Sequence, residues 1–173
     1  MAQKRAQRGF TLTELIVVVA VIAALVGLMF PSFHAVWRMG SSVGCLANLR
    51  SVAVGLRAYL DRNKDIMPVA AQMPSLQLND DPSIAEVLEP YLGGTGALEC
   101  PADTSRRYFQ TEGSSYEYQC IYAGRSVEEG FLTRHLGAER TPVMNDYEPF
   151  HGRAGTPGAA NYLFADGHVG DLD

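Results

Sequence analysis

The hydrophobic pattern of the chain is strongest near its start, where residues 10–30 form a 21-residue apolar stretch containing one charged side chain, Glu14. As an α-helix at about 1.5 Å per residue, this stretch is about 31 Å long, which matches the hydrocarbon core of a bilayer. An ordinary secretory signal peptide has about 7–15 apolar residues and ends at a small-x-small cleavage site, so it fits poorly. The pattern predicts a transmembrane helix over residues 10–30.

A second, amphipathic pattern follows Pro31 and a patch of weak helix formers at residues 40–44 that is expected to flex. Apolar residues then recur at spacings of three and four, as on one face of a helix, while the arginines of this segment face elsewhere. The apolar positions are Leu46, Leu49, Val52, Ala53, Leu56, Tyr59 and Leu60. Met67-Pro68 ends the pattern, because the residue before a proline disfavours helix. This predicts an amphipathic stalk helix over residues 31–66.

The rest of the chain, residues 67–173, predicts a globular head. Three prolines and an Asn-Asp-Asp run indicate a surface loop over residues 68–82. Ser83 and Glu86 then form a capping box that begins a short helix, whose length is limited by Pro90 and the two glycines that follow Leu92.

Strand character appears in the second half of the head. Apolar and aromatic residues alternate over residues 115–122, which predicts a strand, and residues 141–144 and 161–165 predict two more. Asp166-Gly167 follows the last of them and predicts a hairpin, since both residues tolerate positive φ. The fold class expected from these patterns is α+β, with a long N-terminal helix packed on a small antiparallel sheet.

The charge distribution bears on topology and partners. The formal net charge is −5, and the three basic residues Lys4, Arg5 and Arg8 precede the first acidic residue, Glu14. Their position predicts a cytoplasmic N-terminus and an extracytoplasmic head. Without residues 1–9, the 14 basic residues fall to 11 against 19 acidic ones, a net charge of −8. This acidic balance argues against nucleic acid as a partner.

Glu14 is anomalous, because a carboxylate inside an apolar membrane helix costs about 2.5–3.5 kcal/mol on insertion scales. No cationic residue in the stretch can pair with it. Either Glu14 stays hydrated among the lipid headgroups, or it has a partner or a function of its own.

The segment Arg8–Leu15, RGFTLTEL, resembles the leader junction of type IV prepilins and of type II secretion pseudopilins. The resemblance implies that residues 1–9 are a leader, that prepilin peptidase cleaves between Gly9 and Phe10, and that Phe10 is then N-methylated. Glu14 becomes the fifth mature residue and pairs, by analogy, with the α-amino group of a neighbouring subunit. Pro31 matches a proline that kinks the helix in many pilins.

The C-terminal part resembles a prepilin-like group named for a histidine, nine residues and Asp-Gly. Its candidate residues here are His151, Asp166, Gly167 and His168, and the Cys45 and Cys100 segments agree with the same group. The spacing differs, because 14 residues separate His151 from Asp166. The chain therefore departs from the pattern of this group at His151.

Three cysteines, Cys45, Cys100 and Cys120, do not form a dense disulfide framework. Bridging Cys100 and Cys120 would enclose 19 residues and would stabilise an exported head by about 3 kcal/mol. Three separate buried thiols are an equally good interpretation.

Two metal sites are considered. The major pseudopilins carry a C-terminal calcium loop, and Asp166, Asp171 and Asp173 offer oxygen ligands for Ca²⁺ here. A transition metal would instead use His151 and His168 with Asp166 and the acidic residues near them, including Asp146. No recognised spacing places either set on one element. A hairpin with a polar end also needs no ion.

The sequence therefore predicts a structural subunit rather than an enzyme, since it has no nucleophile elbow and no evidently activated cysteine. Its expected partners are prepilin peptidase, other pilin or pseudopilin subunits and the bacterial inner membrane. The subunit is expected to reside in that membrane and then to join a type IV pilus or a type II secretion pseudopilus. Of these two filaments, the pseudopilus is the preferred assignment.

Two alternatives stay open at this point. A membrane-anchored binding protein that never assembles would use the tyrosine-rich face formed by Tyr116, Tyr118 and Tyr122, although these side chains are better explained as sheet packing. An exported metal-dependent enzyme would require His151 and His168 to converge.

Overall fold

The computed structural model describes residues 11–172, apart from the side chains of residues 28–35 and 38. The predicted leader (residues 1–9), its junction at Gly9 and Phe10, and Asp173 therefore lie outside the described residues. The chain divides into two compact units, residues 1–37 and 38–173. The helices and strands are α1 (Leu12–Arg62), α2 (Ile84–Leu92), α3 (Arg107–Glu112), β1 (Tyr116–Tyr118), α4 (Phe131–Leu136), β2 (Pro142–Asp146), β3 (Tyr162–Phe164) and β4 (Val169–Gly170).

The first helix, α1, is continuous in its backbone through Pro31 and through residues 40–44. The expected weak patch is therefore helical, and a kink at Pro31 stays a prediction. The predicted stalk end at residue 66 was wrong, because α1 ends at Arg62. The chain leaves the helix through Lys64 and Asp65, which have φ values of 56° and 58° in the left-handed region, and this geometry stops helical hydrogen bonding before Pro68 is reached.

In the part of the chain that the structure describes, no helix combines the length and the apolar character needed to cross a membrane. The predicted membrane span over residues 10–30 thus has no support from the described residues.

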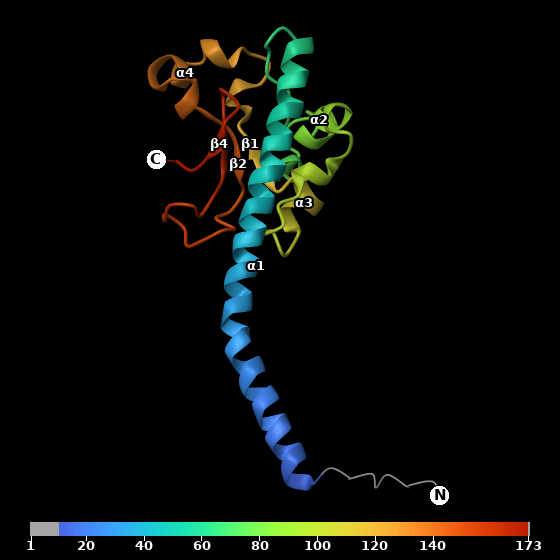
Figure 1. Ribbon diagram of the computed structural model, residues 1–173. Helices are drawn as coiled ribbons and strands as arrows, with labels where there is room; N and C mark the ends of the chain where they lie inside the picture. The colour runs from blue at the N-terminus through green and yellow to red at the C-terminus, as the bar shows by residue number, and fades with distance from the viewer. Residues whose placement is uncertain (1–10, 173) are drawn as a thin grey trace, which may run out of the picture. The chain divides into compact units, whose positions relative to one another are not determined.

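The head core lies between the C-terminal half of α1 and the sheet (Figure 1). The predicted apolar stripe of the stalk is confirmed. Its most buried members, each at most 8% exposed, are Leu49, Val52, Leu56 and Leu60, and Cys45 lies on the same buried face. On the sheet side, the hydroxyl of Tyr116 donates to the carbonyl of Cys45 at 3.3 Å, so the helix and β1 are joined by a buried hydrogen bond as well as by packing.

The sheet has four antiparallel strands in the order β1-β2-β3-β4. Tyr116 lies opposite Asp146, and the strands predicted at residues 141–144 and 161–165 are confirmed as β2 and β3. The hairpin after residue 165 is confirmed too, with Gly167 at φ 91° in its turn. The strand predicted over residues 115–122 was too long, because Cys120–Tyr122 forms a 3₁₀ turn instead.

The predicted short helix is confirmed as α2. The Ser83 hydroxyl accepts a hydrogen bond from the Glu86 backbone N–H, and the Glu86 carboxylate accepts one from the Ser83 backbone N–H, which is the expected capping box. Gly93 ends the helix with φ 69°, while Pro90 lies inside it. The preceding segment is less exposed than predicted, since Pro68 is buried and its carbonyl accepts a 2.7 Å hydrogen bond from the Tyr118 hydroxyl.

Helix α2 packs closely against α1. The rings of Tyr59 and Tyr91 meet edge to face with centroids 5.5 Å apart, and a Cβ built at Gly55 would overlap the Leu92 side chain. Gly55 therefore sets how near the two helices approach.

Replacing Gly55 with valine is expected to lower the free energy of unfolding of the head by about 1–3 kcal/mol, because overpacking forces Leu92 out of its position. The measurement is denaturant unfolding of the full chain in detergent. Gly40→Val in the same helix is the matched control, since a Cβ there meets nothing within 4 Å. Equal losses in the two variants would contradict the close approach at Gly55.

Candidate functional site

The start of α1 carries a local feature that the sequence reasoning missed. The Glu14 carboxylate accepts hydrogen bonds from the Thr11 backbone N–H at 2.8 Å and the Thr11 hydroxyl at 2.7 Å. The Glu14 N–H in turn donates to the Thr11 hydroxyl at 3.3 Å. Thr-x-x-Glu is a capping box, visible in the sequence as the same spacing that marks α2. Within one chain, Glu14 therefore satisfies the helix start.

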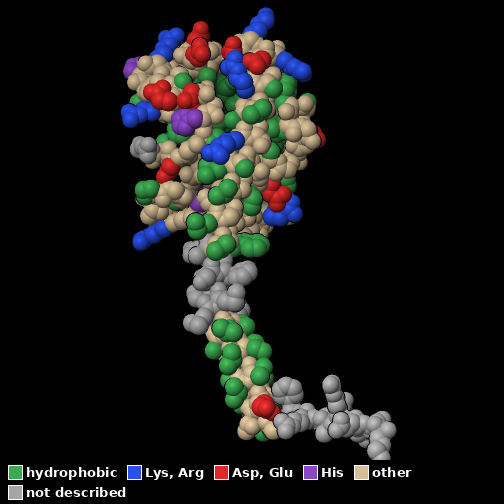
Figure 2. Space-filling view, in the orientation of Figure 1, with side chains coloured by type: hydrophobic (Ala, Val, Ile, Leu, Met, Phe, Trp, Pro, Cys, Tyr) green, Lys and Arg blue, Asp and Glu red, His purple; other side chains and the backbone are tan. Residues whose placement is uncertain are grey.

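The described residues after this cap are apolar on every face. Leu15, Ile16, Val17, Val19 and Leu25 are each between 57% and 60% exposed. Figure 2 shows this stretch as an apolar surface with one acidic side chain near the helix start. A helix that is hydrophobic all round belongs in a buried environment, so this segment needs neighbouring helices or lipid to cover it.

The cysteine pairing predicted from spacing was wrong. Cys45 on α1 and Cys100 form the disulfide, with Cα atoms 4.9 Å apart, and Cys120 is a free, exposed cysteine. The exposed Cys120 thiol lies 3.4 Å from the side-chain oxygen of Gln72. Cys100, by contrast, is buried. The prediction chose the nearer partner along the chain, but α1 brings Cys45 to Cys100 across 55 residues.

Local sequence explains why these two cysteines meet. Gly44 lets the chain after Cys100 approach α1, since a Cβ at Gly44 would lie only 3.1 Å from Pro101 Cγ. One turn further along α1, the side-chain amide of Asn48 donates to the Glu99 carbonyl at 2.7 Å. The helix thus holds the Cys100 segment on both sides of the disulfide.

His151 and Asp146 lie beside this disulfide. Asp146 ends β2, and the His151 N–H donates to the Ala159 carbonyl at 3.0 Å in the segment between β2 and β3. His151 Nε2 is 3.3 Å from Asp146 Oδ2 and 3.6 Å from Cys100 Sγ. The side chains of His151 and Asp146 are 2% and 0% exposed. Within the described residues, Asp146 Oδ1 and His151 Nδ1 have no hydrogen-bond partner.

The remaining C-terminal candidates lie apart from this cluster. His168 Nδ1 is 2.6 Å from Asp166 Oδ1, and the His168 ring stacks on Phe164 with centroids 4.2 Å apart. Burial acts to raise the pKa of the Asp166 carboxyl, but hydrogen bonds from His168 outweigh this effect and lower the pKa. Asp171 accepts a hydrogen bond from the Gly158 N–H.

Among the described residues, the one group of three or more ligand side chains that converge is Cys45, Cys100, Asp146 and His151. His151 and His168 thus share no such group, so the condition set for a metal-dependent enzyme is not met in this part of the chain. Calcium binding by Asp166, Asp171 and Asp173 stays a prediction.

The three tyrosines considered for a binding face are core residues. Tyr116, Tyr118 and Tyr122 are 0%, 0% and 4% exposed, as the packing interpretation expects. Burial raises the pKa of each of these phenols.

Residues 4–30 match the family model described as the prokaryotic N-terminal methylation motif. This match supports a type IV pilin-like or pseudopilin-like protein. No curated protein and no solved structure matches the chain. The motif covers the predicted junction at Gly9 and Phe10 together with Glu14, and it marks the pilin-like chain as a prepilin-type subunit. Proteins of this kind are structural rather than enzymatic.

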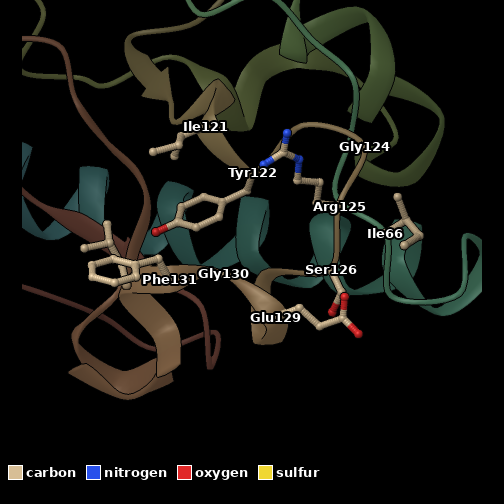
Figure 3. A pocket seen from close by; sticks show the side chains of 10 residues that line it. Ile66, Ile121, Tyr122, Gly124, Arg125, Ser126, Glu129, Gly130 and Phe131 are labelled. Atoms are coloured by element: carbon tan, nitrogen blue, oxygen red, sulfur yellow. The ribbon is translucent and has the colours of Figure 1, made fainter. Parts of the chain in front are cut away.

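The head of the pilin-like protein also contains a pocket of about 600 Å³. Figure 3 shows its lining side chains, among them Ile121, Tyr122, Arg125, Glu129 and Phe131. The Tyr122 hydroxyl is buried and has no hydrogen-bond partner within the described residues. The lining is mainly apolar.

Proposed function

We propose that this pilin-like chain is a filament subunit of a type IV pilus or a type II secretion pseudopilus. Prepilin peptidase removes residues 1–9, Phe10 becomes the methylated N-terminus, and the helix that follows packs against the same helix of other subunits. The exposed apolar surface of α1, interrupted near its start by the single acid Glu14, is the observation that carries this proposal.

The energetics favour association through this helix. Side chains such as Leu12, Val17 and Val26 are 76%, 60% and 46% exposed, and burying apolar surface is worth about 25 cal/mol per Å². The head has its own core around Leu49 and Leu88, so it needs no partner to form that core. In this proposal the apolar part of α1 mediates assembly, and the head is a separate folded part.

Before assembly, the same apolar surface requires lipid. The N-terminal methylation motif is typical of membrane-anchored precursors that later enter a filament. We place the N-terminus in the cytoplasm, because Lys4, Arg5 and Arg8 precede the apolar stretch, and the head on the outer side of the inner membrane.

The test is co-expression of the full chain with a prepilin peptidase and a filament-forming system. Intact-mass analysis is expected to show loss of residues 1–9 and gain of one methyl group, and the sheared filament fraction is expected to contain the mature chain.

Gly9→Val is expected to leave the leader attached, because the scissile bond follows this glycine. Gly27→Val is the matched control and is expected to be cleaved normally, since it lies away from the junction. A mature, methylated chain that never enters filaments would contradict the subunit proposal and favour a solitary membrane anchor.

A further inference from the structure

Four side chains of different types meet in the core of the head. Cys45 comes from α1, Cys100 from the segment before α3, Asp146 from the end of β2 and His151 from the segment before β3. One potential ligand atom from each lies within 4.8 Å of all the others, and three of the four residues are fully buried. Two sulfurs, one imidazole nitrogen and one carboxylate oxygen form a ligand set that suits zinc.

The distances from His151 Nε2 to the nearby sulfur and carboxylate oxygen fit a tetrahedral metal site. With Zn–S of about 2.3 Å and Zn–N and Zn–O of about 2.0 Å, the ligand atoms of a tetrahedron lie about 3.5 Å (sulfur to nitrogen) and about 3.3 Å (nitrogen to oxygen) apart. Cys100 Sγ is 3.6 Å from His151 Nε2, and His151 Nε2 is 3.3 Å from Asp146 Oδ2. His151 Nε2 therefore already lies at the spacing that a bound ion requires from one sulfur and one carboxylate oxygen.

The polar groups of the cluster are incompletely satisfied. In the part of the chain that the structure describes, Asp146 Oδ1 and His151 Nδ1 lack hydrogen-bond partners although both are buried, and such groups cost about 1–3 kcal/mol each. A disulfide needs neither an imidazole nor a carboxylate beside it. A cation would give the buried charge of Asp146 a second partner.

The carboxylate is also held in place from behind. Asp146 Oδ2 accepts a hydrogen bond from the Asn161 backbone N–H at 2.7 Å and from its side-chain amide at 3.2 Å. Metal-binding carboxylates are oriented by outer hydrogen bonds of this kind. Asn161 is the residue that fixes the direction of Asp146 across the β2–β3 pair.

We propose that reduction of the Cys45–Cys100 disulfide converts this cluster into a tetrahedral site for Zn²⁺ or a similar borderline cation. A dithiol supplies two electrons and two protons, so that the S–S bond becomes two thiols and the dithiol becomes a disulfide. Binding of the cation then displaces one proton from each thiol and leaves two thiolate ligands. The disulfide and the metal are alternative links between α1 and the Cys100 segment.

The proposal explains why His151 is buried beside Cys100. The inference goes beyond filament assembly, because the cluster lies in the head and uses none of the residues before Arg38. It is also separate from the predicted calcium ligands, since Asp166 is engaged by His168 and Asp171 by the Gly158 N–H.

The test uses the full chain in detergent, reduced with a phosphine under anaerobic conditions, freed of reductant and titrated with Co²⁺. The reduced protein is expected to bind one Co²⁺ per chain, with a thiolate-to-metal charge-transfer band and the intense visible absorption of a tetrahedral site. Zn²⁺ should displace the cobalt. The oxidised wild-type protein contains the same residues without free thiolates at Cys45 and Cys100, and it should show neither band.

Variants assign the ligands. Cys45→Ser should abolish binding of a single tetrahedral ion. His151→Ala should weaken it by at least about 100-fold, since loss of outer-shell partners alone costs about 10–100-fold. Cys120→Ser and His135→Ala are the matched controls, because both residues are exposed and outside the cluster, and they should bind as the wild type does. The fold of His151→Ala can be checked in the oxidised state, where the disulfide still forms.

A reduced wild-type protein without the charge-transfer band would overturn the proposal. So would a weak octahedral spectrum, or a tetrahedral spectrum that survives His151→Ala unchanged.

Discussion

Loss of the Cys45–Cys100 disulfide is expected to lower the free energy of unfolding of the head by about 4 kcal/mol. The two cysteines are separated by 55 residues, and on the chain-entropy model a closed loop of this length restricts the unfolded chain by about that amount. An exported head is in a compartment where such a bond persists. The loss would be a large fraction of the total stability of a small domain, which is about 5–15 kcal/mol.

The disulfide also contributes to the folded state. It joins α1 to the segment that Asn48 and Gly44 already hold close to the helix, so the native geometry meets the bond without further rearrangement of these elements. We expect the reduced protein without metal to open first where the Cys100 segment leaves α1.

The measurement is denaturant unfolding of the full chain in detergent, followed by the near-ultraviolet signal of buried tyrosines such as Tyr116 and Tyr118. Oxidised protein is compared with protein reduced in the presence of a chelator and with a Cys45→Ala, Cys100→Ala double variant. Cys120→Ala is the matched control and should change the unfolding free energy by less than about 0.5 kcal/mol. Equal midpoints for oxidised and reduced protein would show that the bond contributes nothing.

The second large effect is expected at Glu14. Replacing it with glutamine should leave leader removal intact and reduce incorporation into filaments to background. Glutamine keeps an oxygen that can accept the hydrogen bonds from Thr11, so the helix cap is retained. It removes the charge that, in the assembled filament, would pair with the α-amino group of a neighbouring Phe10. An ion pair of this kind in an apolar environment mainly fixes the register of neighbouring subunits and contributes little to stability.

Thr11→Ala separates the two roles of Glu14. It removes the hydroxyl of the cap, which is worth about 1 kcal/mol, but leaves the carboxylate in place. This variant should still assemble. The readouts are the mature mass of the chain and its amount in sheared filaments. Assembly of Glu14→Gln with failure of Thr11→Ala would mean that Glu14 acts only as a cap.

Much of the fold could be predicted because its signals are short-range. The capping box at Ser83 and Glu86, the glycine that ends α2 and the Asp166-Gly167 turn each depend on a few neighbouring residues, and each is confirmed. The buried stripe of α1 followed from the helical period alone. The errors arose where a nearby signal was overridden, as at Lys64 and Asp65, whose left-handed conformation ends α1 before Met67-Pro68.

The sequence by itself determined the motif at residues 4–30 and the division into an apolar helix, an amphipathic stalk and an α+β head. Hydrophobic periodicity and a contiguous motif need no knowledge of distant contacts. Only the tertiary structure decided that Cys45 pairs with Cys100, and that His151 and Asp146 lie beside them while His168 pairs with Asp166. The cluster of Cys45, Cys100, Asp146 and His151 joins residues up to 106 positions apart, and the packing of α1 on the sheet brings them together. Spacing along the chain carries no information about such packing.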